Sequence, residues 1–193
     1  VCPNRVYVEA SVAEAYAEKL AAEVAKIPVG PAFEAGVKVG PLIEDKAIAK
    51  VEDHLAKVQA SGGRVLTGGA RHELGGRFFQ PTVTLGGDDK LFREEETFGP
   101  LIPVFPFETE DEVLGKANDS EFGLASYLFT RDLDRASRIG RRIEGGMCGV
   151  NPGLISTAVA PFGGVKSSGY GKEGSVHGID EYVDIKAVTL ALR

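Results

Sequence analysis

Strand-like and helix-like segments alternate along most of this chain, with short links between them. This alternation predicts an α/β domain with a mostly parallel sheet, flanking helices and right-handed crossovers. The strand-like segments span 5–9, 64–67, 78–85, 101–107, 126–130 and 147–150, and the helical segments span 11–27, 44–60, 109–118 and 134–143.

Several of these segments have recognisable end signals. Thr109 and Glu112 have the spacing of a capping box, and Asp132 is expected to open the last helix. Pro81 is expected to place the 78–85 strand at a sheet edge, because proline cannot donate a ladder hydrogen bond. Ser11 is expected to cap the first helix, and helical spacing predicts that its buried face carries Val12, Ala15, Tyr16, Leu20, Val24 and Ile27.

The stretch 151–172 has the composition of neither a helix nor a strand. It contains five glycines, two prolines and four Ser or Thr residues, and a loop of this length is usually functional. Gly163 and Gly164 are expected to adopt positive backbone angles and to let the main chain approach another surface closely. An ordinary connector between two elements remains the alternative.

The end of the chain is expected to form one more strand. Residues 171–178 predict a short helix, and the alternation of apolar residues over 182–192 predicts a terminal strand, which places a boundary between 181 and 182. A free strand this rich in Val, Ile and Leu is an adhesive edge. It therefore either pairs with a partner or closes the sheet of its own domain.

Charge and hydropathy exclude several classes of function. The 193 residues have a net charge of -6, and the 22 basic side chains are dispersed, which argues against a nucleic-acid partner. No apolar run approaches the roughly 18 residues of a membrane-spanning helix. The first ten residues also lack the pattern of a secretory signal, so a cytoplasmic location is expected.

The cysteines and histidines do not have the spacing of a metal site. Cys2 and Cys148 form no CxxC pair, and His54, His72 and His177 are scattered, so no zinc site is expected. Cys148 lies on a predicted buried strand and is expected to be a small core residue. The histidines are expected to be structural or solvated, without partners at useful spacing.

The segment 93–100, REEETFGP, places three carboxylates before an aromatic residue that is fixed by Gly-Pro. A solvated acidic turn is the usual interpretation of such a run. A second interpretation is that Glu96 accepts hydrogen bonds from a vicinal diol while Phe98 packs on an adjacent ring. That arrangement would hold a ribose with its attached base.

Two motifs together, EETFGP at 95–100 and NPGLISTAVAPFGGVKSSGYGKEG at 151–174, resemble the C-terminal half of the aldehyde dehydrogenase superfamily. The resemblance covers essentially all 193 residues and is greatest to the succinate-semialdehyde branch, at 2–5, 149–156 and 171–186. It implies a Rossmann-like catalytic domain over 1–181, an oligomerisation strand over 182–193 and a homo-oligomer.

The resemblance also implies roles for four residues. Glu96 matches the glutamate that holds the nicotinamide ribose, and Phe98 matches the aromatic residue beside it. Ser156 matches the serine that donates to the distal carboxylate of the substrate, and Phe162 matches an aromatic residue of the aldehyde tunnel. From the residues alone, a hydroxyl that caps local backbone and an aromatic that packs in a core remain the alternatives for Ser156 and Phe162.

The first five residues resemble those that follow the family's nucleophilic cysteine. Cys2 then corresponds to the second cysteine of a C-V-C pair, and the nucleophile is expected just before Val1. An alignment that makes Cys2 itself the nucleophile conflicts with Pro3 and with the C-V-C pattern. Where that pair is complete, a disulfide between its thiols is a hypothetical redox switch.

The implied activity is NAD- or NADP-dependent oxidation of an aldehyde, with succinate semialdehyde as the expected substrate, through covalent attack by a thiolate. The general base, the oxyanion-hole asparagine and the nucleotide-binding domain are expected upstream, so residues 1–193 alone are expected to be inactive. A general aldehyde dehydrogenase without acid preference and a non-catalytic assembly module of the same fold are the alternatives.

Overall fold

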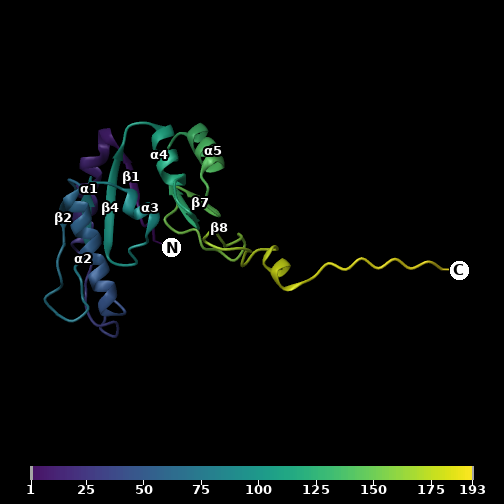
Figure 1. Cartoon of the computed structure of the whole chain (residues 1–193), viewed down its shortest axis with the longest axis horizontal. Helices are drawn as coiled ribbons and strands as arrows, with labels where there is room; N and C mark the ends of the chain where they lie inside the picture. The colour runs from purple at the N-terminus through teal and green to yellow at the C-terminus, as the bar shows by residue number, and fades with distance from the viewer. Residues whose placement is uncertain (1, 193) are drawn as a thin grey trace. The chain divides into compact units, whose positions relative to one another are not determined.

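A computed structural model describes residues 2–192, which divide into two units, Cys2–Asp119 and 120–192 (Figure 1). The first unit contains a four-stranded sheet in the order β1-β4-β3-β2. Its strands are β1 (Val6–Glu9), β2 (Arg64–Thr67), β3 (Thr82–Leu85) and β4 (Leu101–Phe107). Strand β4 is parallel to β1 and β3, whereas β2 is antiparallel to β3. The predicted α/β fold with a mostly parallel sheet is therefore confirmed.

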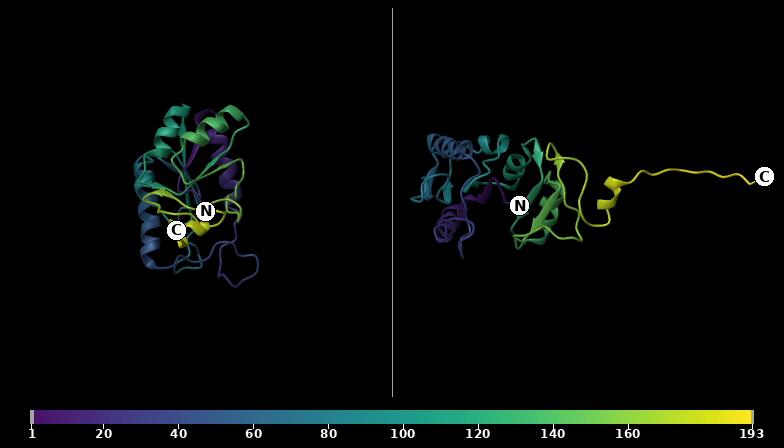
Figure 2. Two further views of the ribbon diagram at one scale, coloured as in Figure 1. Left: turned by 90° about the vertical axis from the view of Figure 1, so that its right-hand side faces the viewer. Right: turned by 90° about the horizontal axis from the view of Figure 1, so that it is seen from below.

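Helices cover both faces of this sheet (Figure 2). Helix α1 (Ala10–Val24) packs on the face that carries Val83 and Val104, and α2 (Asp45–Ala60) packs on the face that carries Leu101 and Phe105. Neighbouring residues of β4 thus point to opposite faces, as the period of a strand requires. Two shorter helices, α3 (Lys90–Glu94) and α4 (Glu110–Asn118), complete the unit.

The second unit is smaller and has two short pairs of strands. Strands β6 (Ala125–Leu128) and β7 (Met147–Val150) are parallel and are connected through α5 (Leu133–Arg142). Strands β5 (Phe122–Gly123) and β8 (Val165–Lys166) are antiparallel. A single 3-10 helix, η1 (Gly178–Tyr182), lies near the end of the described chain.

Two predicted helix caps, one in each unit, are present. Thr109 accepts a hydrogen bond from the backbone N–H of Glu112 at 3.2 Å, and Asp132 accepts one from Arg135 at 3.0 Å. Each cap satisfies an N–H that the helix itself leaves without a partner. These two boundaries followed from local sequence signals, because capping needs only residues three apart.

The prediction of an edge position for the third strand is wrong. Strand β3 begins at Thr82, after Pro81, and lies inside the sheet between β2 and β4. Two further prolines, Pro103 and Pro106, lie within β4, which is also an inner strand. Thr82 donates to the carbonyl of Pro100, just before β4, and Gly86 donates to the carbonyl of Val104, so the even-numbered residues of this stretch face β3. Pro106 therefore faces β3 just past its end, and Pro103 faces the residues before β1. No ladder hydrogen bond is lost at either proline.

The predicted buried face of the first helix is confirmed at Val24 and wrong at Val12, Ala15 and Tyr16. Leu20 and Ile27 are partly buried against the same core. Helix α1 begins at Ala10, so Ser11 lies inside it, and no side chain caps its start. Its buried residues are Ala13, Ala17, Ala21 and Val24, whereas Val12 is 53% exposed and Tyr16 is 43% exposed. Small side chains let this helix approach the sheet closely, and a pattern of large apolar residues could not reveal that choice.

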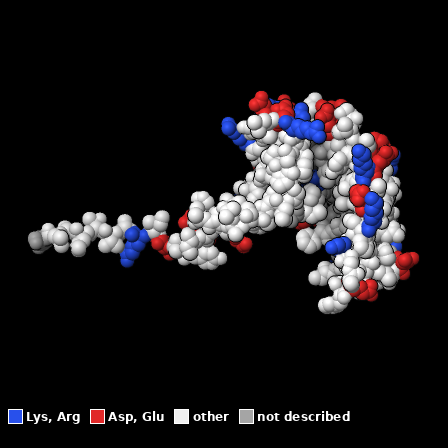
Figure 3. Space-filling model, turned by 180° about the vertical axis from the view of Figure 1, so that it is seen from behind, with Lys and Arg blue, Asp and Glu red and all other residues white. Residues whose placement is uncertain are grey.

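The region after residue 170 differs from its prediction in two respects. Residues 171–178 form turns and bends, and helical structure begins only at Gly178 as a 3-10 helix that includes Tyr182. Residues 183–192 are extended and pair with no strand of the described chain. Their apolar side chains are exposed, and Figure 3 shows this tail as mostly uncharged. Pairing of the tail with a partner stays a prediction.

No helix within residues 2–192 has the length and apolar character needed to cross a bilayer.

The corrected face of α1 predicts different responses to the same substitution at two alanines. Ala17 is fully buried against the sheet, so Ala17→Leu should overpack the core and lower the free energy of unfolding by about 1–3 kcal/mol. Ala15 is exposed on the same helix, so Ala15→Leu should change it by less than about 0.5 kcal/mol. Urea denaturation measures both, and a larger loss at Ala15 would contradict the observed face.

Candidate functional site

The predicted site residues lie in both units. Glu96 and Phe98 share the loop 95–100 of the first unit, and Ser156 and Phe162 share the loop 151–172 of the second. The members of each pair therefore lie in the same loop.

In the loop 95–100, successive side chains alternate between outside and inside. Glu96 is exposed, and its carboxylate has no hydrogen-bond or ion-pair partner among residues 2–192. Thr97 is buried, with 2% of its surface exposed, and the ring of Phe98 is 81% exposed. The loop thus presents a free acceptor and an aromatic face to the outside, while the residue between them is fixed in the interior.

The backbone at Phe98 has a left-handed conformation, with φ 50°. This conformation is uncommon for a residue with a bulky side chain and costs about 1–3 kcal/mol. The next residue is restricted in a different way, because a Cβ at Gly99 would lie 2.4 Å from Val51 Cγ2 of α2. The loop therefore rests against α2 at a glycine, and the strained residue just before it turns its ring outward.

Asn4 holds the loop from one side with three hydrogen bonds. Its Oδ1 accepts from the backbone N–H of Thr97 at 3.1 Å, and its Nδ2 donates to the carbonyls of Phe92 at 2.9 Å and Glu95 at 3.1 Å. The two carbonyls lie at the C-terminal end of α3, where a helix leaves its acceptors without internal partners. The Asn4 side chain thus binds the free carbonyls at the end of α3 and fixes the loop that follows this helix.

His54 holds the loop from α2, which agrees with the expected structural role, through a partner that its sequence spacing did not indicate. Its Nδ1 lies 2.9 Å from Thr97 Oγ1, and its Nε2 lies 3.4 Å from Glu95 Oε2, without a well-aligned hydrogen bond. Burial lowers the pKa of His54, although the neighbouring Glu95 opposes that shift. Lys50, 3.0 Å from Glu95 Oε1, lowers the pKa of Glu95 chiefly through its hydrogen bond. A fully buried, neutral imidazole therefore lies directly behind the loop.

In the second unit, Ser156 is exposed, and its hydroxyl has no partner among the described residues. The local capping that was the alternative for Ser156 is therefore absent. Phe162 is half-buried, and its backbone exchanges two hydrogen bonds with Glu173, at 2.8 Å and 2.7 Å. Those bonds hold the position of Phe162 in a segment that has little regular structure.

The two glycines after Phe162 allow close approach, but their predicted positive φ angles are not observed. A Cβ at Gly163 would lie 2.5 Å from the carbonyl oxygen of Gly171, and one at Gly164 would lie 2.6 Å from Ser168 Cβ. Positive φ angles occur instead at Gly169 and Gly171. The loop thus folds back on itself where two stretches of glycine meet, which a rule applied to single residues does not capture.

The cysteines of the described chain differ in environment. Cys2 is exposed, and Cys148 is half-buried on β7. Burial raises the pKa of the Cys148 thiol, which reduces the fraction of reactive thiolate at neutral pH. Cys148 is only half-buried and lies outside the two core clusters, so the expectation that it is a small core residue is met only in part. Within residues 2–192, no group of three or more His, Cys, Asp or Glu side chains could hold a metal ion.

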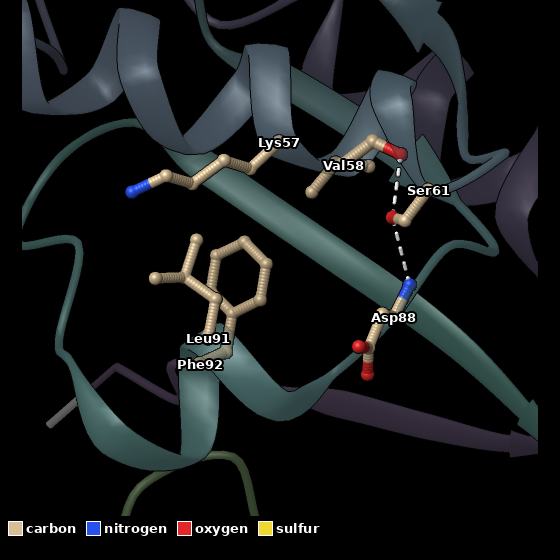
Figure 4. A pocket seen from close by; sticks show the side chains of 6 residues that line it. All are labelled: Lys57, Val58, Ser61, Asp88, Leu91 and Phe92. Carbon is tan, nitrogen blue, oxygen red and sulfur yellow. Dashed lines mark hydrogen bonds between the residues drawn. The ribbon is translucent and has the colours of Figure 1, made fainter.

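A small hollow lies beside α2 and α3, and its lining includes none of the predicted site residues (Figure 4). Its volume is about 120 Å³, which is below the roughly 300 Å³ of an ordinary ligand pocket. Ser61 at its rim donates to the carbonyl of Val58 and accepts from the N–H of Asp88, both at 2.9 Å. The hollow is lined by Lys57, Val58, Ser61, Asp88, Leu91 and Phe92. Its size and its satisfied polar groups indicate a packing feature.

Comparison with known proteins identifies the relatives of this chain. Residues 1–188 match the model of the aldehyde dehydrogenase family. Glutarate-semialdehyde dehydrogenase of Pseudomonas aeruginosa is 52% identical over 98% of this chain and 40% of its own length. Succinate-semialdehyde dehydrogenase GabD of Escherichia coli, whose name specifies NADP(+), is 49% identical over 100% of this chain and 40% of its own length.

A solved structure is similar over the same region. The crystal structure of succinate-semialdehyde dehydrogenase from Burkholderia pseudomallei superposes with a TM-score of 0.93 and is 53% identical, over 96% of this chain and 39% of that one. The chain thus spans about 40% of the length of the curated relatives that it matches.

The strain at Phe98 predicts that a substitution there stabilises the protein. Asparagine tolerates the left-handed conformation better than phenylalanine, and the exposed ring loses little burial, so Phe98→Asn should raise the free energy of unfolding by about 1 kcal/mol. Phe33 is also fully exposed but has no positive φ, so Phe33→Asn is the matched control and should give no such gain. Urea denaturation distinguishes them, and a loss of stability in Phe98→Asn would refute the assignment of strain.

Proposed function

The chain belongs to the aldehyde dehydrogenase family, and we propose that it serves in the NAD(P)-dependent oxidation of a small aldehyde that bears a carboxylate, such as succinate semialdehyde. The observation that carries this proposal is the loop 95–100. It presents the partner-free carboxylate of Glu96 beside the exposed, strained Phe98.

The residues of that loop fit the ribose of a nicotinamide cofactor. A carboxylate without a protein partner can accept hydrogen bonds from two neighbouring hydroxyls, and such charge-assisted bonds are about twice as strong as neutral ones. Phe98 offers a ring face for packing beside it. When bound, the cofactor supplies the acceptor for the hydride that leaves the substrate. Glu96 and Phe98 hold and orient the cofactor.

Ser156 supports the choice of an acidic substrate. Its exposed hydroxyl is free to donate to a carboxylate oxygen, and the relatives named above act on aldehydes that carry a second, acidic end. A hydroxyl alone binds a carboxylate weakly, so a cationic partner is needed as well, and we place it upstream of this region. Phe162, held by its backbone bonds to Glu173, lines the path of the aldehyde.

The reactive thiol is supplied by a cysteine that precedes Val1, and the general base and the nucleotide-binding domain also lie upstream. Two observations support this assignment: the relatives are about two and a half times longer, and the raised pKa of Cys148 makes that thiol a poor nucleophile. Residues 1–193 by themselves are then inactive. Covalent attack on the aldehyde and hydrolysis of the resulting thioester need groups from the rest of the protein.

The function predicts separate losses in two variants of the whole protein. Glu96→Gln should raise the KM for NADP or NAD, and Ser156→Ala should raise the KM for succinate semialdehyde about tenfold, because a hydrogen bond to a charged group is lost. Steady-state assays that monitor the reduced cofactor measure both, with butanal as the aldehyde without a carboxylate. Ser167→Ala is the matched control, since that hydroxyl of the same loop bonds to Glu121.

Two outcomes would decide against parts of this function. An unchanged KM for succinate semialdehyde in Ser156→Ala would favour a general aldehyde dehydrogenase without acid preference. The absence of cofactor reduction with every aldehyde would favour a non-catalytic assembly module.

The exposed tail supports a homo-oligomer as the functional form. Residues 183–192 carry five exposed large apolar side chains and only two charged residues, so an unpaired tail would be adhesive. We propose that a second copy of the protein pairs with it. The exposed apolar residues are Val183, Ile185, Val188, Leu190 and Leu192.

Removal of the tail is therefore expected to change the assembly state. A chain that ends before Asp184 should be monomeric in light scattering, because the strand that joins the copies is gone. A second variant, with Ile185, Val188 and Leu190 replaced by serine, keeps the chain length and should also dissociate. An unchanged molar mass in both would contradict the proposed interface.

A further inference from the structure

We propose that Asn4 and His54 are positioning residues for the cofactor: together they hold Thr97, so that Glu96 and Phe98 on either side of it face outward. This inference rests on the proposed function, because the loop 95–100 matters only if it binds the cofactor. It assigns a role to Asn4, near the start of the first unit, and to His54, in the interior of that unit.

The first observation is that side chains bind both the backbone N–H and the hydroxyl of Thr97. Its backbone N–H donates to Asn4 Oδ1 at 3.1 Å, and its hydroxyl lies 2.9 Å from His54 Nδ1. Both polar groups of Thr97 beyond its carbonyl are thus bound to side chains from different elements. Since Thr97 is almost fully buried, loss of either partner leaves a buried polar group unsatisfied.

The second observation is that Asn4 itself occupies a fixed position. Its neighbour Arg5 donates to the carbonyls of Lys116 at 2.9 Å and Ala117 at 3.3 Å, near the end of α4. Strand β1 then begins at Val6 and pairs with β4. Asn4 is therefore fixed on one side by a strand and a helix end, and its amide makes all three of its hydrogen bonds to the segment 92–97.

The third observation is that His54 cannot move away from the loop. Its ring is fully buried and stands edge-on to Phe92, with 5.6 Å between the ring centroids. Helix α2 holds the backbone of His54 through a core that includes Val51 and Leu55. The contact with Thr97 thus joins the loop to the packed interior. The exposed residues Glu96 and Phe98 beside Thr97 are therefore held rigidly as well.

A loop that is held in advance binds a ligand more tightly, because the ligand does not have to order it. Among residues 2–192, Glu96 and Phe98 have no side-chain partners of their own that would fix them, so their placement depends on Thr97. Weakening the contacts of Thr97 should therefore reduce the affinity for the cofactor. The chemical steps, once the cofactor is saturating, should be affected far less.

The test uses the whole protein and three kinds of variant. Asn4→Ala removes the contact to the Thr97 N–H, and Thr97→Val removes only the hydroxyl that meets His54. Thr97→Ser retains that hydroxyl and serves as the conservative rescue. Ser61→Ala is the control, because it removes two hydrogen bonds in the first unit, a number between the three lost in Asn4→Ala and the one lost in Thr97→Val. Those two bonds lie at the rim of the hollow and not at the loop.

Four measurements separate positioning from general stability. They are the Kd of NADPH and of NADH from fluorescence titration, the kcat at saturating cofactor, the free energy of unfolding in urea, and hydrogen exchange of the peptide that contains Thr97. Asn4→Ala and Thr97→Val should raise the Kd about three- to tenfold, with kcat changed less than about twofold and with faster exchange at Thr97. Thr97→Ser should restore most of the affinity that Thr97→Val loses.

Ser61→Ala should lose stability but keep the Kd of the unaltered protein. The inference fails if Asn4→Ala and Thr97→Val keep that Kd, or if Ser61→Ala raises the Kd as much as they do for the same loss of stability. If the unaltered protein binds neither NADPH nor NADH, the proposed function itself fails, and the inference fails with it. The titration of the unaltered protein therefore distinguishes the two failures.

Discussion

The burial of Thr97 is the constraint on which the loop 95–100 depends. A threonine in the interior must satisfy both its N–H and its hydroxyl, and here Asn4 and His54 supply the two partners. Once Thr97 is fixed, its neighbours Glu96 and Phe98 have to face outward. A contact that looks purely structural thereby determines which groups are available to a ligand.

The loop 95–100, which exposes Glu96 and Phe98, has a strained backbone. A left-handed Phe98 and the close approach of Gly99 to Val51 both constrain the backbone of this loop. Such strain persists only where the surrounding structure enforces it, and the core around α2 provides that support. The apolar pattern of the sequence therefore forms the core between the sheet and α2. That core supports the loop, and the loop exposes the carboxylate of Glu96.

Local signals made much of the fold predictable, and the errors arose where distant contacts decide. The caps at Thr109 and Asp132 depend on residues a few positions apart, and the structure has them as predicted. The buried alanines of α1 were missed because alanine carries little hydrophobic signal. The contact between Asn4 and Thr97 spans 93 residues, so no local pattern could indicate it. The partner of His54 was missed for the same reason, since Thr97 lies 43 residues away.

The central claim is that Thr97 anchors a loop whose exposed residues bind the cofactor ribose. A crystal structure of the whole protein with NADPH bound tests it most directly. The account predicts the Glu96 carboxylate within about 3 Å of the ribose hydroxyls next to the nicotinamide, with Thr97 still bonded to Asn4 and His54. A bound cofactor whose ribose lies far from Glu96 and Phe98 would contradict it.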